Sequence, residues 1–333
     1  MRPHQSGRYN PRTQHAAKGV WNKFFRESHM PFANPLRKTL LATLLFAVWA
    51  GAAWAGPKQS QSKVLRMGIN PWGTEKEMRD MFRPLLDYLG EHLGVTVQMV
   101  VPTTYDELLD RVSAGELDIV AFNSVTYLRS RRMGLPMRYI ATMDNIFDGE
   151  STSRSYYTGY IFVRKDSPYR SLDDLKGKTF AFVDPSSASG FKMPAAMIGL
   201  RKGATPEKYF SKFFFVGDHS EVASAVYYGC VDAGATWDNS YNMNTQPQRF
   251  GAAFRIIERT PPIPNDAWAV GPRVDSTLAA KLKRVLLLID RTTKTRDGRT
   301  VLNPALGFPG SGWSERSPQF YENAADLLLY AQN

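Results

Sequence analysis

The chain has 333 residues and a formal net charge of +11, from 42 Lys or Arg against 31 Asp or Glu. Its single cysteine, Cys230, excludes an intramolecular disulfide. Residues 1–55 hold eight basic residues and one acidic residue, so the remaining 278 carry 34 basic and 30 acidic residues, a net charge of +4. Overall charge therefore gives no argument for nucleic-acid binding once that segment is set apart.

The segment 1–55 has the features of a secretory signal peptide. Arg37 and Lys38 precede a short apolar run at residues 40–52, and Ala53-Trp54-Ala55 is a small-x-small cleavage pattern. A membrane-spanning helix is the alternative, but the run is shorter than the roughly 20 apolar residues of a span, and polar sequence follows it. We expect cleavage after Ala55 and export to the periplasm.

Two further expectations concern this region. Met30 is a second possible start, which would leave residues 1–29 untranslated, and residues 56–63 form a polar tether. No cysteine lies near the cleavage site, which argues against a lipid anchor.

After the tether, apolar strand patterns alternate with amphipathic helical patterns. Strands are expected at 64–69, 95–101, 119–122 and 138–143, and helices at 75–89, 105–113 and 125–133. Thr74, with Glu77 three residues later, predicts a capping box at the start of the first helix. Three consecutive β-α units predict a mostly parallel sheet with buried strands.

A polar loop at 144–155 interrupts this series, and a second series follows it. Residues 156–164 predict a strand that crosses to a second lobe, and residues 268–270 predict the returning strand. Between them we expect strands at 179–183, 212–216 and 231–237 and helices at 190–201, 220–228 and 239–244, and after them helices at 276–290 and 317–330. The predicted fold is α/β, with lobe 1 at 64–155 plus 268–333, lobe 2 at 156–267, and a ligand cleft between them.

The strand at 179–183 leads into a turn of small residues that starts a helix. The hydroxyls of Ser187 and Ser189 and the backbone N–H groups of residues 189–191, including Gly190, would point out of the helix N-terminus. The helix dipole also favours an anion there, so this turn is a candidate oxyanion site. The alternative is that Ser187 or Ser189 only caps the helix.

Other polar side chains follow the predicted strands, where ligands bind in open α/β sheets. They are Thr74, Tyr105, Asn123, Ser124, His219, Asp238 and Asp266. Neutral donors suit a tetrahedral oxyanion, whereas the two carboxylates suit a positive group on the same ligand or repel a second negative charge. Ser124 and Asp238 as helix caps, and Tyr105 as a residue packed on a helix surface, remain as alternatives.

Catalysis and metal binding find little support. Ser187, His219 and an Asp could form a triad, but the G-x-S-x-G elbow is absent, and two serines at a helix start favour anion binding over nucleophilic attack. After residue 55, His219 has only His92 as a companion, which argues against a metal site built on histidine. We expect no enzyme activity and no cofactor.

The order of these features resembles the PhnD-like family, the periplasmic substrate-binding proteins of phosphonate, phosphite and phosphate ABC transporters. The most specific part is Asp184-Pro185-x-Ser187-x-Ser189-Gly190-Phe191, supported by motifs at 171–178, 217–219 and 263–266. The resemblance covers residues 64–330. It implies a type II periplasmic binding protein fold that closes on its ligand like a hinge, an ABC permease in the inner membrane as partner, and no nucleic acid. We expect a monomer.

The resemblance also assigns roles to residues. In family members that bind an aminoalkylphosphonate, a Ser-Thr-Ser turn, tyrosines and a histidine hold the phosphonate, and two acids meet the amine. The positions that match these groups here are Ser187, Ser189, Tyr105 and His219 for the phosphonate and Asp238 and Asp266 for the amine.

Three positions depart from that pattern. Ala188 stands in place of threonine, Phe122 in place of tyrosine, and Asp238 in place of the longer glutamate. A lost hydrogen bond to a charged oxyanion weakens binding by about 1.5 to 3 kcal/mol, so the same ligand would bind more weakly unless residues such as Trp72 or Trp237 compensate.

The expected function is that of a periplasmic solute-binding protein, which captures a small phosphorus oxyanion, in particular an organophosphonate, for an ABC importer. The alternative is a ligand-sensing module of the same fold that acts on a membrane histidine kinase.

Overall fold

The computed structural model describes residues 63–146, 152–317 and 319–329. The expected signal peptide and all but the last residue of the expected tether lie outside these ranges. Across the ranges that are described, no helix combines the length and the apolar character needed to cross a membrane.

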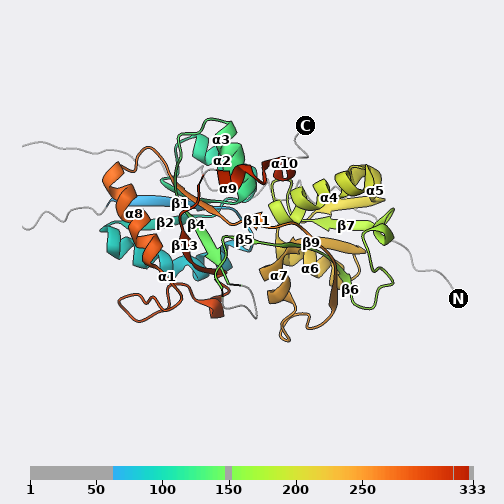
Figure 1. Ribbon diagram of the computed structural model, residues 1–333. Helices are drawn as coiled ribbons and strands as arrows, with labels where there is room; N and C mark the ends of the chain where they lie inside the picture. Colours follow the sequence, from blue (N-terminus) through green and yellow to red (C-terminus); the bar gives the residue numbers. More distant parts are fainter. Residues whose placement is uncertain (1–62, 147–151, 318, 330–333) are drawn as a thin grey trace, which may run out of the picture. The chain divides into compact units, whose positions relative to one another are not determined.

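The first lobe is built on a six-stranded sheet with the strand order β13-β4-β12-β3-β1-β2 (Figure 1). Its strands are β1 (Val64–Ile69), β2 (Thr96–Val100), β3 (Ile119–Phe122), β4 (Arg138–Asn145), β12 (Ala267–Val270) and β13 (Gly310–Ser314). The helices of this part are α1 (Glu75–Leu93), α2 (Tyr105–Ser113), α3 (Ser124–Arg132) and α8 (Ser276–Leu288). The predicted capping box of Thr74 and Glu77 is confirmed at the start of α1.

The prediction of a mostly parallel sheet is wrong for this lobe. β1 pairs parallel with β2 and β3, but β12 is antiparallel to β3 and β4, and β13 is antiparallel to β4. The reason is that the chain returns from the second sheet and inserts β12 between β3 and β4 in the opposite direction. β13 was not predicted, because Gly310 and Gly312 disrupt the apolar alternation of a strand.

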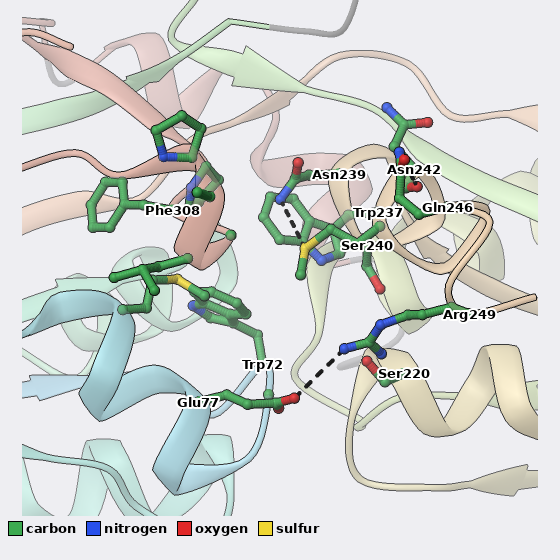
Figure 2. Close-up of a pocket in the computed structure, with 18 of the residues that line it drawn as sticks. Trp72, Glu77, Ser220, Trp237, Asn239, Ser240, Asn242, Gln246, Arg249 and Phe308 are labelled. Carbon is green, nitrogen blue, oxygen red and sulfur yellow. Dashed lines mark hydrogen bonds and ion pairs between the residues drawn. The ribbon is translucent and has the colours of Figure 1, made fainter. Parts of the chain in front are cut away.

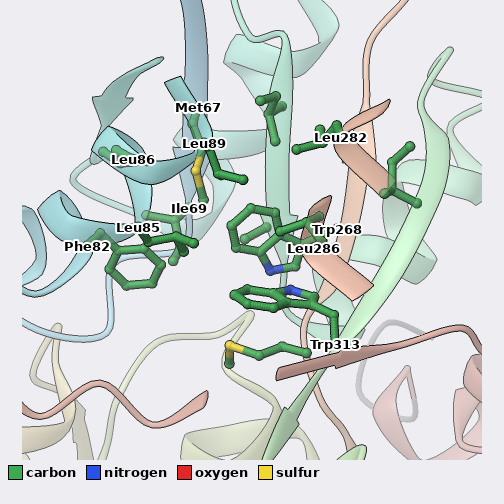
Figure 3. Packing of buried hydrophobic residues seen from close by; sticks show 14 of the residues in the cluster. Met67, Ile69, Phe82, Leu85, Leu86, Leu89, Trp268, Leu282, Leu286 and Trp313 are labelled. Carbon is green, nitrogen blue, oxygen red and sulfur yellow. The ribbon is translucent and has the colours of Figure 1, made fainter. Parts of the chain in front are cut away.

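Tryptophan side chains form the centre of the first core. Trp268 of β12 is fully buried and lies edge-on to Trp313 of β13, with ring centroids 5.1 Å apart. Figure 3 shows Phe82 of α1 and Leu286 of α8 gathered around this pair. This packing fixes the strands whose ends carry the site.

The second lobe is built on a five-stranded sheet with the order β10-β6-β9-β7-β8 (Figure 1). Its strands are β6 (Gly159–Arg164), β7 (Thr179–Phe182), β8 (Lys212–Phe215), β9 (Ala233–Trp237) and β10 (Phe254–Arg259). Its helices are α4 (Met193–Lys202), α5 (Pro206–Tyr209), α6 (His219–Tyr227) and α7 (Asp238–Asn244). β7 is parallel to β8 and β9, whereas β6 is antiparallel to β9 and β10.

Two short strands connect the sheets: β5 (Tyr156–Tyr157) pairs antiparallel with β11 (Ile263–Pro264). The predicted strand at 156–164 is thus broken at Thr158 into β5 and β6. Residues 268–270 form a strand as predicted, but its role as the returning strand is wrong, because these residues pair inside the first sheet as part of β12.

The predicted helix at 317–330 is also interrupted, and it forms α9 (Gln319–Glu322) and α10 (Ala325–Leu328). α10 packs against α3 of the first lobe and α4 of the second. The chain end therefore adds a further contact between the lobes.

Candidate functional site

The turn after β7 is the most tightly built part of the site. Ala188–Lys192 form a π-helical turn that continues into α4, so the helix begins two residues earlier than predicted. Ser187 caps this turn, because its Oγ accepts a hydrogen bond of 3.1 Å from the N–H of Gly190. A Cβ on Gly190 would lie 2.4 Å from Cγ2 of Val183, which makes glycine necessary here.

A cavity of about 50 Å³, here called the inner cavity, opens beside the turn and is lined from both lobes. Six of the predicted site residues line it: Tyr105, Asn123, Ser187, Ser189, His219 and Asp266. A water molecule needs roughly 10–15 Å³ of such volume, so the inner cavity suits a group of a few heavy atoms.

Each of the two serines that line the inner cavity has a tyrosine neighbour. The phenol of Tyr105 lies within hydrogen-bonding reach of Ser187, and the phenol of Tyr157 lies within reach of Ser189. Burial raises the pKa of both phenols well above the usual value, and neighbouring carboxylates raise it further. Both phenols are therefore neutral hydrogen-bond donors at any physiological pH.

His219 is a neutral imidazole in this setting. It is the first residue of α6 and is buried, and its Nδ1 lies 2.9 Å from Oγ1 of Thr236. Burial lowers the pKa of His219 to about 3. It can thus offer a hydrogen bond to an oxyanion but no positive charge at neutral pH.

Asp266 lies between β11 and β12 and lines the inner cavity, to which it is partly exposed. Burial raises its pKa to about 7, so near neutral pH the carboxyl group is present in both protonation states. This group differs from the hydroxyls around it because its charge depends on pH.

The other four predicted site residues do not line the inner cavity. Thr74 is an exposed cap of α1, and Ser124 is buried with an unpartnered Oγ at the start of α3. The N–H of Gly190 is used by Ser187. Asp238 is buried and accepts a hydrogen bond of 3.0 Å from the N–H of Thr158, so it supports the junction of β5 and β6.

The alternative roles of Ser124 and Asp238 as helix caps, and of Tyr105 as a residue packed on a helix surface, are not found. Asn123, rather than Ser124, caps α3, and its side chain also donates a hydrogen bond of 3.1 Å to the carbonyl of Ser186 across the lobes. Asp238 is the first residue of α7 and does not cap it. Tyr105, which could have packed on a helix surface, is buried beside the inner cavity.

Sequence reasoning missed Tyr157, Asn145 and Asn265 as cavity residues. Tyr157 was placed inside a continuous strand, although Gly159 was a signal for a break: a Cβ there would lie 2.8 Å from Thr260. Asn145 and Asn265 meet side by side, with Nδ2 of Asn145 donating to Oδ1 of Asn265 at 3.2 Å. Their positions depend on the crossing strands, which the sequence did not place correctly.

A larger space of about 790 Å³, here called the outer cavity, shares Trp72 and Trp237 with the inner cavity (Figure 2). The two indole rings meet edge to face with centroids 5.7 Å apart. Glu77 of α1 and Arg249 of the second lobe form an ion pair of 3.7 Å at this cavity (Figure 2). The tryptophan pair therefore separates a small inner site from a wide entrance.

A cluster of charges lies on the other side of the turn. Nη1 of Arg129 donates to Oγ of Ser186 at 2.6 Å and to Oδ1 of Asp106 at 2.5 Å. Burial alone would raise the pKa of Asp106, but the hydrogen bond and charge of Arg129 outweigh it and lower the pKa. Together, Asp106, Arg129 and Ser186 link α2 and α3 of the first lobe to the turn of the second.

The donor set gives no support for a metal. Over the described ranges, no three His, Cys, Asp or Glu residues are grouped as a metal ion would require. The site consists instead of hydroxyls, phenols, amides, one neutral imidazole and one carboxyl group.

The chain is similar to known proteins, and it spans less than two thirds of the length of the curated relatives that it matches. The chain is 27% identical over 181 residues to the phosphate-import protein PhnD of Mycolicibacterium smegmatis, a match that covers 53% of this chain and 56% of that protein. It is 23% identical over 245 residues to the tetrathionate sensor histidine kinase TtrS of Salmonella typhimurium, which covers 70% of this chain and 40% of that protein.

A solved structure shows the same fold. PhnD1 from Prochlorococcus marinus in complex with methylphosphonate matches with a TM-score of 0.70 and 21% identity, over 81% of this chain and 98% of that one. The family model for the periplasmic substrate-binding protein of phosphonate ABC transporters matches residues 67–317. The chain therefore belongs to this family of substrate-binding proteins, which are not enzymes, and has the type II periplasmic binding protein fold.

Proposed function

We propose that this protein captures a small phosphorus oxyanion, in particular an organophosphonate, in the periplasm and delivers it to an ABC importer. The observation that carries the proposal is the inner cavity, where two serines, two tyrosines and a neutral histidine surround space for a few heavy atoms. Hydroxyl groups fixed at a helix start are well suited to the oxygens of a tetrahedral oxyanion.

The second tyrosine bears on the choice of ligand. Ala188 and Phe122 remove two hydroxyls relative to the pattern of aminoalkylphosphonate binders, but Tyr157 brings one phenol to Ser189. The names of two relatives support a small ligand: one is called a phosphate-import protein, and one was solved with methylphosphonate. A compact phosphonate or phosphate therefore fits better than a ligand with a long amine arm.

Ligand capture would involve closure of the lobes about β5 and β11. These are the only paired strands that join the two larger sheets among the described residues, and each is two residues long. We propose the predicted division into lobe 1 at 64–155 plus 268–333 and lobe 2 at 156–267, except that Ala267 belongs to lobe 1 because it pairs in the first sheet as part of β12. The protein would act as a monomer, because each lobe supplies one half of the same cavity.

A ligand screen tests the proposal. Isothermal titration of the protein lacking residues 1–55 should show binding of methylphosphonate, phosphite or phosphate, and a ligand at 100 times its Kd should stabilise the fold by about 2.7 kcal/mol in a thermal-shift assay. The absence of binding by every phosphorus oxyanion would contradict the proposal.

A second candidate is a sensing role on a membrane histidine kinase, which the similarity to the tetrathionate sensor kinase supports. Uptake separates the two roles. A strain that lacks this protein should lose import of the bound phosphonate if the protein serves a transporter, whereas a sensor would alter gene expression and leave import by an expressed transporter intact.

A further inference from the structure

Asp266 places a carboxyl group inside a cavity that is otherwise built for an anion. Its side chain has no hydrogen bond to any other residue in the described part of the chain, and it lines the inner cavity beside the serine turn. Because the cavity measures only about 50 Å³, a bound oxyanion cannot lie far from this carboxyl group.

The surroundings of Asp266 supply no positive charge. The described residues that line the inner cavity include no Lys or Arg, and His219 is neutral. The groups that face Asp266 are the phenols of Tyr105, Tyr157 and Tyr321, and Asp238 adds negative charge near Tyr157. Lys192 belongs to the serine turn, but its electrostatic partners are Arg129, Asp106 and Asp184 on the other side.

An ionised Asp266 and a fully ionised ligand would therefore repel each other at short range in a partly desolvated site. One proton held between them removes the repulsion and turns it into a hydrogen bond. Either a protonated Asp266 donates to an oxygen of the ligand, or a hydroxyl of the ligand donates to the ionised carboxylate.

We infer that the inner cavity selects oxyanions that share one proton with Asp266, which favours phosphorus oxyanions with a titratable hydroxyl over sulfonates and sulfate. This inference rests on the proposed function and narrows its ligand class. It also gives Asp266 a role different from the ammonium partner that the resemblance implies. The raised pKa of Asp266, about 7, supports it because a proton is then available near neutral pH.

Proton-linked titration calorimetry tests the inference. Methylphosphonate is titrated at pH 9 in two buffers with different enthalpies of ionisation, so that the difference in heat gives the number of protons taken up. The wild-type protein should take up about one proton per ligand, and its affinity should fall about tenfold per pH unit once Asp266 and the ligand are both ionised.

An asparagine in place of Asp266 removes the need for a shared proton between this side chain and the ligand. In Asp266→Asn, the side-chain amide can donate to the dianion, so proton uptake at pH 9 should fall close to zero and the affinity should become nearly independent of pH. Asp110→Asn is the matched control, because Asp110 is an exposed residue of α2, and it should behave as the wild type.

Methanesulfonate gives a second readout, because it carries no proton to share. It should bind the wild-type protein at pH 6 and lose about tenfold in affinity per pH unit above pH 7, and this loss should disappear in Asp266→Asn.

Three results would overturn the inference. The first is proton uptake near zero in the wild type at pH 9, which can be judged even if the variant does not fold. The second is equal uptake in the wild type and Asp266→Asn. The third is 2-aminoethylphosphonate binding at least tenfold more tightly than methylphosphonate, with the advantage lost in Asp266→Asn, which would make Asp266 an ammonium partner. If no phosphorus oxyanion binds at any pH, the proposed function fails as well.

Discussion

The two sides of the Ser186–Ser189 turn differ in the groups that surround them: one side has uncharged hydrogen-bond donors, and the other has an ion pair. On one side, Ser187 and Ser189 line the inner cavity, whose described lining contains no Lys or Arg. On the other side, Ser186 is hydrogen-bonded to Arg129 and Asp106. A cation facing the ligand would attract any anion, whereas fixed neutral donors also discriminate by the position of each oxygen. The charges hold the turn, and we propose that the hydroxyls contact the ligand.

The sharpest way to break this comparison is to remove the hydroxyls that face the cavity. Ser187→Ala with Ser189→Ala deletes two hydrogen bonds to a charged ligand, each worth about 1.5 to 3 kcal/mol, so methylphosphonate should bind at least ~100-fold more weakly by titration calorimetry. Ser187→Ala also removes a helix cap and should lower the free energy of unfolding by about 1 kcal/mol.

Ser113→Ala is the control for this double variant, because Ser113 is exposed at the end of α2. It should leave the dissociation constant unchanged. If the double variant bound methylphosphonate as tightly as the wild type, the serine side of the turn would not be the ligand side.

The next largest effect concerns His219, whose neutrality keeps positive charge out of the inner cavity. Because its pKa is about 3 in the folded protein and about 6.5 when unfolded, the unfolded chain binds more protons between these values. His219 thus lowers the free energy of unfolding as pH falls from 6.5 towards 3, by about 3 kcal/mol at pH 4. His219→Asn should remove this contribution.

Asp266 has the opposite effect on the pH dependence of the free energy of unfolding. The variant must therefore be compared with the wild type at each pH. Its folded pKa of about 7 exceeds the unfolded value near 3.8, so its contribution to stability grows as pH falls from 7 towards 4. In the wild type the two trends offset each other. Denaturant unfolding of the wild type and of His219→Asn at pH 4, 5.5 and 7 should show the variant gaining relative stability towards pH 4, whereas the exposed control Ser113→Ala should follow the wild type at each pH.

The sequence predicted the elements of this site better than their assembly. The small-residue turn, Tyr105 and His219 are local features: each follows a strand or starts a helix, and each lines the inner cavity. Asp266 was found because a polar residue follows Ile263-Pro264, although the returning strand was placed too late.

The missed residues depend on contacts between distant segments. Tyr157 lines the cavity because β5 pairs with β11, more than 100 residues away in sequence. The Arg129–Ser186 hydrogen bond joins residues 57 positions apart. No pattern within a window of one or two elements carries such pairings, since they arise from the packing of two lobes.

The smallest expected effect comes from the charged side of the turn. Arg129→Met keeps the aliphatic stem but removes the hydrogen bonds to Ser186 and Asp106. Because the side chain of Asp106 is 63% exposed, solvent screens the pair, and we expect a loss of only about 1 kcal/mol in ligand affinity, roughly fivefold. A double-mutant cycle with Ser186→Ala should give a coupling energy of about 0.5 to 1.5 kcal/mol.

Salt separates the two sides of the turn in the same experiment. At 1 M salt the Debye length falls to about 3 Å, so the affinity of the wild type for methylphosphonate should approach that of Arg129→Met. The effect of the serine substitutions should persist, because salt screens hydrogen bonds from neutral donors much less. If Arg129→Met instead reduced affinity as much as the double serine variant, the guanidinium would act on the ligand itself. The division between a charged support and a neutral binding face would then be wrong.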